Sequence, residues 1–230
     1  ALLDGKPVIG AAVELTLDPD IQRAAWDALG NRKGAVVALD PATGRILAMV
    51  SKPSFDANQL AGHLYAPVND AYTVYEQDED QPLINKAIAG DLYHPGSVFK
   101  LIVTAAALES GQFTTGTQFR NLKSYTLPGT TTEIRNSGGS SCGAGDIVTL
   151  EVALIKSCNI PFAMLATELG DDRIRAMAEL MGFGTELSIP LKVTPSYYPE
   201  NPDIPQTALT GFGQFDVRVT PLQMAMVSAA

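Results

Sequence analysis

The 230-residue sequence lacks several features that define common classes of protein. No apolar run approaches the roughly 20 residues that a membrane-spanning helix needs. The longest runs, such as LIVTAAAL, have the length of a core helix. Basic residues are not in excess, because 16 Lys and Arg stand against 25 Asp and Glu, for a net charge of −9. Electrostatics therefore give no support to a nucleic-acid partner.

Cysteine is equally scarce. Cys142 and Cys158 are the only two cysteines, and they lie 16 positions apart. A disulfide that closes a loop of this length would contribute about 3 kcal/mol in the chain-entropy model. Two buried thiols are the alternative, and they would be favoured in a cytosolic protein. From the residues alone, both alternatives stay open.

The chain also has no internal repeat and no low-complexity linker, while hydrophobic residues make up 46% of it. We therefore expect residues 1–230 to belong to one α/β domain with long functional loops.

Helix and strand signals alternate along the first fifty residues. AAVELTL (11–17) is typical of a strand, and Asp18 with Pro19 then predicts the start of a helix that Gly30 ends. GAVVALD and RILAMVS, joined by a turn at 41–44, predict a β-hairpin. Their near-continuous hydrophobicity indicates burial on both faces. The expected architecture is an antiparallel sheet covered by helices on both faces.

Two regions, 52–92 and 119–147, have no hydrophobic period and are expected to be irregular. The second contains one strand-like piece, TEIRN. An acidic cluster in the first region has no ligand spacing, and we interpret it as a solvated loop rather than a cation site. Its members are Glu76, Asp78, Glu79 and Asp80. Further helices are predicted at 98–109, 149–156, 161–169 and 172–181.

One short stretch, YHPGSVFKLIVTAAALES (93–110), combines a charged amine with an apolar helix. Ser97 and Lys100 are three residues apart and would face each other across one helical turn. Aliphatic neighbours disfavour the ammonium form of a lysine, so Lys100 is a candidate base for the hydroxyl of Ser97. The alternative is a serine N-cap followed by a lysine that reaches water, which is the common case for an isolated S-x-x-K.

A second polar pair lies in KSCNIPF (156–162). Ser157 and Asn159 cannot share a helix face, but they can share one side of an extended turn. A helix that begins at Thr149 would end near Lys156, and Pro161 favours a new helix with Asn159 as its cap. We expect a polar tip between two helices, and the alternative is that Asn159 only caps.

These two motifs together resemble those of the penicillin-binding transpeptidases, a family with an S-x-x-K motif. Four other stretches resemble the family in the same order: VALDPATGRILAMVSKPSFD, QPLINKAI, GFGQ and VTPLQMA. The similarity runs from about residue 11 to 230. It is greatest to the class B, monofunctional branch, and within it to the penicillin-binding protein A type associated with cell division. The resemblance implies an α/β (α+β) fold with an antiparallel sheet between helices and a helical subdomain.

The resemblance also implies a role for each motif residue. Ser97 would be the acylated nucleophile and Lys100 its base. Ser157 would relay a proton to the leaving amine, and Asn159 would hydrogen-bond the amide of the substrate, so both would also bind substrate. The substrate of the family is a peptidoglycan stem peptide ending in D-Ala-D-Ala, which β-lactams mimic. No metal or organic cofactor is implied, because side chains supply the nucleophile, base and relay.

A location and partners follow from the same resemblance. The enzyme would work on the outer face of the cell membrane, held by an N-terminal anchor absent from this chain, with cell-division proteins as partners. Disulfides persist outside the cytoplasm, so we expect Cys142 and Cys158 to pair and to tether the tip that carries Ser157 and Asn159. A D,D-carboxypeptidase or β-lactamase, and a non-catalytic penicillin-binding sensor or scaffold domain, are the alternatives.

The third motif of the family, K-[ST]-G on an edge strand, is absent from these residues. We therefore expect residues 1–230 to be a partial transpeptidase domain that lacks its C-terminal strands. In the family that strand supplies one of the two donors of the oxyanion hole, and loss of one such donor costs about 10²–10³ in rate. The 230 residues alone are expected to be nearly inactive.

Overall fold

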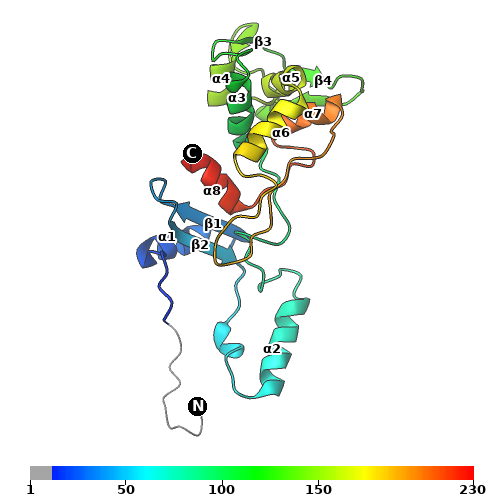
Figure 1. Cartoon of the computed structure of the whole chain (residues 1–230). Helices are drawn as coiled ribbons and strands as arrows, with labels where there is room; N and C mark the ends of the chain where they lie inside the picture. The colour runs from blue at the N-terminus through cyan, green and yellow to red at the C-terminus, as the bar shows by residue number, and fades with distance from the viewer. Residues whose placement is uncertain (1–11) are drawn as a thin grey trace.

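The computed structural model describes residues 12–230. The helices are α1 (Pro19–Leu29), α2 (Tyr65–Gln77), α3 (Lys100–Glu109), α4 (Leu150–Ile155), α5 (Asn159–Leu169), α6 (Asp171–Leu180), α7 (Ile204–Thr210) and α8 (Pro221–Ala229). The strands are β1 (Gly34–Leu39), β2 (Ile46–Lys52), β3 (Gln118–Arg120), β4 (Ser124–Thr126), β5 (Glu133–Arg135) and β6 (Ile147–Thr149). Short 3₁₀ turns lie at η1 (Ala57–Gln59), η2 (Gly96–Phe99) and η3 (Ser137–Gly139). The described residues form three parts: a β-hairpin with helices α1 and α8, a helical part with α3 to α7 and the small strands, and a projecting arm that contains α2 (Figure 1).

The N-terminal helix and the hairpin form as predicted. The carboxylate of Asp18 accepts hydrogen bonds from the backbone N–H groups of Asp20 and Ile21, with Pro19 as the first helical residue. β1 and β2 pair in antiparallel register, and Asp40 holds the turn through bonds to Ala42 and Thr43. Both strands contact α1, and β1 also contacts α8, which lies above the hairpin in Figure 1.

The prediction of a strand at 11–17 is wrong for residues 12–17, and residue 11 lies outside the described residues. Val13 and Leu15 alternate with polar residues, as in a strand, but their side chains are 80% and 66% exposed. Among the described residues, the hydrogen bonds from this end of the chain to β2 are those from the hydroxyl of Thr16 to Ile46 O and from the next residue but one, Asp18, to Leu47 O. Without a continuous ladder, the alternation alone does not make a strand.

The prediction that residues 52–92 are irregular is also wrong, because they contain η1 and the 13-residue helix α2. This helix projects away from the hairpin (Figure 1). None of its residues is buried. A helix that buries no face needs no periodic apolar stripe, so it gave no signal from which it could be predicted.

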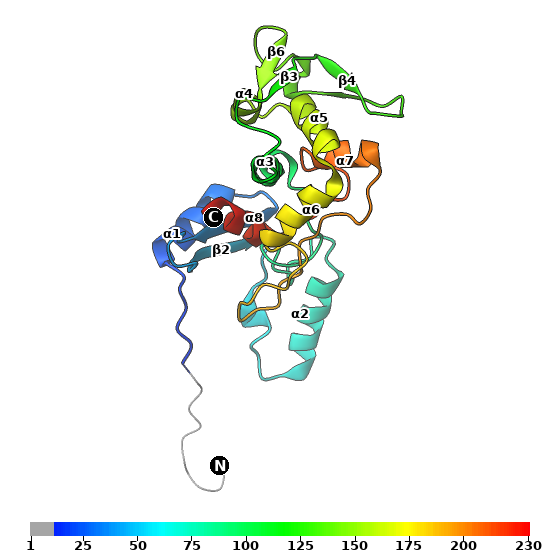
Figure 2. The ribbon, with the colours of Figure 1, turned by 45° about the horizontal axis from the view of Figure 1, so that its top comes forward.

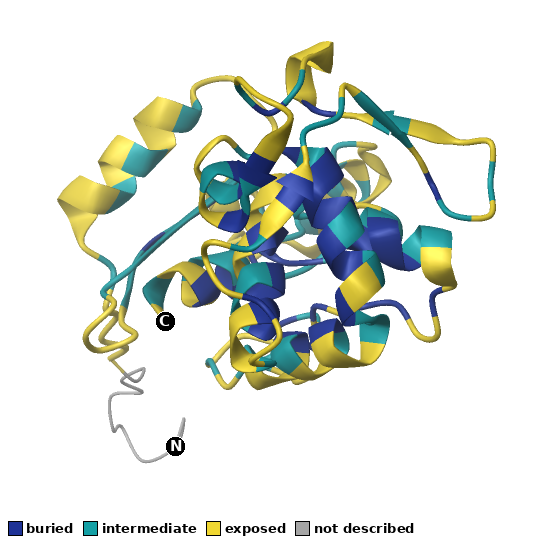
Figure 3. Ribbon diagram, turned by 90° about the horizontal axis from the view of Figure 1, so that it is seen from above, coloured by how far each residue is buried: buried dark blue, intermediate teal, exposed yellow. Residues whose placement is uncertain are grey.

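The main core lies in the helical part. The four predicted helices are present as α3 to α6, and α5 begins at Asn159, two residues earlier than predicted. α3 packs against α5 and α6, and α5 packs against α7. The fully buried side chains of this part include Phe99 of η2, Ile102 of α3, and Phe162 and Leu165 of α5. Figure 2 shows α3 between the hairpin and the small strands, and Figure 3 shows the buried residues gathered at the centre.

The second region without a hydrophobic period, 119–147, is built from short ladders. β3 pairs with β6, and β4 pairs with β5. The predicted strand-like piece TEIRN corresponds to β5. The α/β class, with antiparallel sheets and a helical subdomain, is therefore confirmed. In residues 12–230, every helix is too short or too polar to span a bilayer.

Candidate active site

Ser97 lies in η2, where the chain enters α3. Ser97 is exposed, so its hydroxyl is accessible from solvent. The loop that carries it is held by the segment 213–219, because Gly96 N donates to Gly213 O at 3.0 Å and Tyr93 pairs with Val219 through two backbone bonds. The S-x-x-K stretch thus forms one 3₁₀ turn that continues directly into a helix, which places residue 100 beneath residue 97.

Lys100 is fully buried at the start of α3. Its Nζ lies 3.1 Å from Ser97 Oγ, 3.2 Å from Ser157 Oγ, 2.8 Å from Ser157 O and 2.9 Å from Asn159 Oδ1. None of these partners is a carboxylate. Burial without a compensating negative charge lowers the pKa of Lys100 to about 8. A substantial fraction of the amine is therefore neutral near physiological pH.

The four partners of Lys100 fit a neutral amine. Ser157 O and Asn159 Oδ1 can only accept, so they take the two N–H donors that an uncharged amine has. The single lone pair of the nitrogen can then accept from one hydroxyl, that of Ser97 or that of Ser157. When Ser97 is the donor, the pair has the arrangement that a serine nucleophile requires of its base.

Ser157 and Asn159 lie at a tip between α4 and α5, as expected. The tip is backbone-strained, because Ser157 has φ +53°, a left-handed conformation that costs a non-glycine residue about 1–3 kcal/mol. The prediction that Asn159 caps α5 is wrong. Asn159 is the first residue of the helix, and Cys158 takes the N-cap position.

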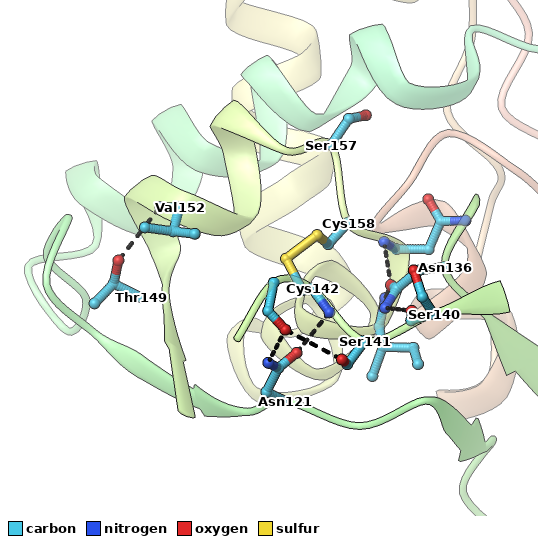
Figure 4. Close-up of a disulfide and its surroundings, with 12 residues drawn as sticks. Asn121, Asn136, Ser140, Ser141, Cys142, Thr149, Val152, Ser157 and Cys158 are labelled. Carbon is cyan, nitrogen blue, oxygen red and sulfur yellow. Dashed lines mark hydrogen bonds between the residues drawn. A yellow bond between two sulfur atoms is a disulfide. The ribbon is translucent and has the colours of Figure 1, made fainter. Parts of the chain in front are cut away.

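The expected disulfide between Cys142 and Cys158 is confirmed (Figure 4). Both cysteines are buried. Because Cys158 stands between Ser157 and Asn159, the bond ties the tip directly to the loop that precedes β6. The four predicted motif residues are thus brought together, because the side chains of Ser97, Ser157 and Asn159 all lie within hydrogen-bond distance of the amine of Lys100.

Two features of the site were not found by sequence reasoning. Asn136 is buried and accepts hydrogen bonds from the backbone at the start of α5, across 23 positions in sequence. Gly213, within the GFGQ stretch, has φ +73°, and a Cβ there would lie 2.1 Å from Gly96 O. Only the glycine pattern of GFGQ gave a signal, since nothing near Asn136 in the sequence points to α5.

Ser97 and Asn159 open onto a cavity of about 560 Å³. Arg135 and Gln214 give it polar groups, while Phe212 and Phe215 form part of an apolar wall. A cavity with an apolar wall and a few convergent polar groups suits a peptide-sized ligand. The arrangement thus brings together an exposed serine, a buried amine and a cavity.

Comparisons of the sequence with known proteins all match it to one family. The family model described as "Penicillin binding protein transpeptidase domain" matches residues 34–230. The chain is 43% identical to peptidoglycan D,D-transpeptidase PbpA of Mycolicibacterium smegmatis, covering 98% of this chain and 47% of that protein. The corresponding protein of Mycobacterium tuberculosis is 41% identical over the same shares. The chain therefore spans about half the length of the curated relatives it matches.

Solved structures agree with the sequence comparisons. The penicillin G acyl-enzyme complex of penicillin-binding protein A from M. tuberculosis superposes with a TM-score of 0.92 at 40% identity, covering 100% of this chain and 54% of that one. Penicillin-binding protein 2 of Pseudomonas aeruginosa superposes with a TM-score of 0.82 at 32% identity, covering 94% and 48%.

Proposed function

The chain belongs to the penicillin-binding protein transpeptidase family, and from this premise we propose that it carries the nucleophile of a serine-type D,D-transpeptidase. The proposed substrate is a peptidoglycan stem peptide ending in D-Ala-D-Ala, and β-lactams would acylate the same serine. Relatives that match most of the chain are named peptidoglycan D,D-transpeptidases, and a similar solved structure is a penicillin G acyl-enzyme complex. Because the chain spans about half of those relatives, the proposal concerns the full-length protein.

The observation that carries this proposal is the contact between Lys100 and the exposed residue Ser97. Lys100 is buried and has no carboxylate among its hydrogen-bond partners. A lysine that only reached water would keep its head group exposed. A serine that only capped a helix would not have a base beneath it. The contact instead supports general-base activation of Ser97 by Lys100.

In the proposed acylation, Ser97 Oγ attacks the carbonyl carbon of the penultimate D-Ala while its proton passes to Lys100 Nζ. The peptide C–N bond then breaks. The proton returns through the hydroxyl of Ser157, 3.2 Å from the amine, to the nitrogen of the departing D-Ala. The products are a Ser97 ester and free D-alanine.

In the second step, the amine of a neighbouring stem peptide attacks the ester carbonyl. The amine loses a proton to Lys100, the ester C–O bond breaks, and the proton restores the hydroxyl of Ser97. A β-lactam enters the first step by opening of its ring amide. Its leaving nitrogen stays covalently attached to the acyl group, so the place of the acceptor amine is obstructed and the ester persists.

The test is the mass of the intact full-length protein after treatment with penicillin. We expect one adduct with the mass of the whole antibiotic, because ring opening releases no fragment, and the modified peptide should be 93–110. The Ser97→Ala variant should show no adduct. Ser110→Ala, which removes a hydroxyl from the other end of the same helix, should be labelled normally. An adduct on any other peptide would overturn the assignment.

Persistence of the adduct separates the proposal from its hydrolytic alternative. A transpeptidase should keep the ester far longer than a β-lactamase, in which water completes the reaction. Glu133, a carboxylate on the cavity-lining strand β5, is paired with Arg135 and its side chain is 44% exposed, so nothing singles it out as a base for water. Rapid loss of the adduct would favour the β-lactamase.

We also propose that residues 1–230 are part of a larger domain whose K-[ST]-G strand completes the oxyanion hole. The absence of that motif from the sequence supports this proposal, as does the length of the relatives. Labelling of the 230-residue chain with fluorescent penicillin should then be about 10²–10³ slower than labelling of the full-length protein. Equal labelling rates would contradict it.

A location outside the cytoplasmic membrane, with an anchor and cell-division partners, completes the proposal. The Cys142–Cys158 disulfide supports an oxidising compartment. Protein taken from cells and denatured without reductant should have no free thiol at Cys142 or Cys158, and two free thiols there would contradict an oxidising compartment. A fluorescent fusion to the full-length protein should gather at the division site, and an even distribution along the cell wall would argue against division partners.

A further inference from the structure

The start of α5 has no cap of its own. Cys158 occupies the N-cap position, but its side chain is committed to the disulfide and makes no capping hydrogen bond. Pro161 has no backbone N–H. The free donors of the first turn are therefore the N–H groups of Asn159 and Ile160, and a helix start needs partners for such groups.

A residue from another part of the chain supplies both partners. Asn136, which follows β5, accepts from Asn159 N at 2.9 Å and from Ile160 N at 3.0 Å through one oxygen, Oδ1. Its Nδ2 donates to Ser140 O at 3.0 Å. The residue is 6% exposed. Figure 4 shows its side chain aimed at the backbone of the tip, beside the disulfide.

This contact bears on the amide side chain of Asn159. Its backbone N–H is held by Asn136, and its Nδ2 donates to the backbone oxygen of the preceding residue, Arg135, at 3.1 Å. Both attachments thus come from the end of β5. With Nδ2 held there, Oδ1 of Asn159 is directed to Lys100 Nζ at 2.9 Å.

We propose that Asn136 is a positioning residue for acylation of Ser97, acting through Asn159. It fixes the first turn of α5, so that Asn159 presents its amide oxygen to Lys100. The hydrogen-bonding capacity that the Asn159 amide has left then faces the cavity. Without the oxygen of Asn136, the N–H groups of Asn159 and Ile160 lose their shared acceptor and must bond to water instead. The inference rests on the proposed function, because it assigns Asn136 to that reaction.

A half-buried asparagine in the same region, Asn121, provides a control with the same number of side-chain hydrogen bonds. Asn121 also makes three hydrogen bonds to the loop around Cys142: it accepts from Cys142 N and donates to Gly143 O and Gly145 O. None of these hydrogen bonds goes to α5. Loss of either side chain removes three hydrogen bonds next to the disulfide, but only one of the two touches Asn159.

The experiment measures the acylation rate constant and the apparent dissociation constant for penicillin in the full-length protein. The protein concentration is taken from a titration of active sites, so that unfolded molecules do not lower the rate constant. We expect Asn136→Ala to lower the rate constant about 10–100-fold, the range that a small misplacement of reacting groups produces. Asn121→Ala should destabilise the protein and leave the rate constant at its parent value. Equal rate constants in the two variants would overturn the inference.

A conservative variant tests the role of the oxygen. Asn136→Asp keeps an acceptor for both N–H groups, and its charge suits the positive end of a helix. The Asn136→Asp variant should retain most of the acylation rate when the pH is well above the pKa of Lys100. At such a pH Lys100 is already neutral, so the added carboxylate no longer changes its protonation state. A folded Asn136→Asp protein that has lost acylation tenfold or more would refute the positioning role, even if the alanine variant does not fold.

The same measurements separate this inference from the proposed function. Normal labelling of Ser97 in both the parent protein and Asn136→Ala would refute only the role of Asn136. Failure of the parent protein to be labelled on 93–110 would refute the proposed function and this inference together.

Discussion

The rate at which penicillin acylates Ser97 should follow the titration of Lys100. In the proposed mechanism the neutral amine is the reactive form, and burial lowers the pKa of Lys100 from 10.5 to about 8. About one molecule in eleven then has a neutral amine at pH 7, about half at pH 8 and about ten in eleven at pH 9. The rate should therefore rise about fivefold from pH 7 to 8 and less than about twofold from pH 8 to 9.

An unperturbed lysine gives a different curve. With a pKa of 10.5, the neutral fraction would still rise about tenfold per unit through pH 9. The lowered pKa of Lys100 also makes the stability of the folded protein depend on pH. The folded state binds the proton less readily than the unfolded state, so burial of this amine destabilises the protein fully below pH 8. That penalty, about 3 kcal/mol, is relieved as pH rises from about 8 to 10.5.

The assay is stopped-flow acylation of the full-length protein with a chromogenic β-lactam between pH 6 and 10, corrected for spontaneous hydrolysis. Lys156→Met is the matched control, since it removes an exposed lysine next to the tip and should leave the curve in place. Lys100→Met should abolish the pH-dependent rise along with most of the rate. A tenfold rise per unit that continues past pH 9 in the parent protein would refute the reasoning.

Three further predictions concern the groups around Lys100. Ser157→Ala should slow acylation about 10²-fold without moving the pH curve, because the relay is lost and the base remains; a parent-like rate in stopped flow would contradict this. Gly213→Ala should lower both melting temperature and labelling, because its Cβ would lie 2.1 Å from a backbone oxygen, whereas Gly129→Ala, with a similar positive φ and open space, should leave labelling intact. Replacement of Cys142 and Cys158 by serine should lower the free energy of unfolding in urea by about 3 kcal/mol, and a loss under about 1 kcal/mol would show that the loop is held otherwise.

Local signals predicted much of the fold. Asp18 with Pro19 sets the start of α1 through groups within four residues, and the hairpin follows from two apolar runs around one turn. The S-x-x-K spacing likewise places an amine under a hydroxyl by helix geometry alone. In each case the partners are close in sequence, so the pattern contains the contact.

Contacts between distant segments escaped prediction. Asn136 meets Asn159 across 23 positions, and Gly213 meets Gly96 across more than 100, so no local pattern contains either contact. The strand predicted at 11–17 failed for the opposite reason. Its alternation is local, but a strand needs a partner ladder, and residues 12–17 have none in the described part of the chain.

The central claim is that Lys100 is a partly neutral amine at physiological pH. The most direct measurement is an NMR titration of the full-length protein labelled with ¹³C at lysine Cε, with Lys100→Arg used to assign the signal. One lysine resonance, absent from Lys100→Arg, should titrate at about pH 8. A Lys100 signal that titrates near 10.5 would contradict the account.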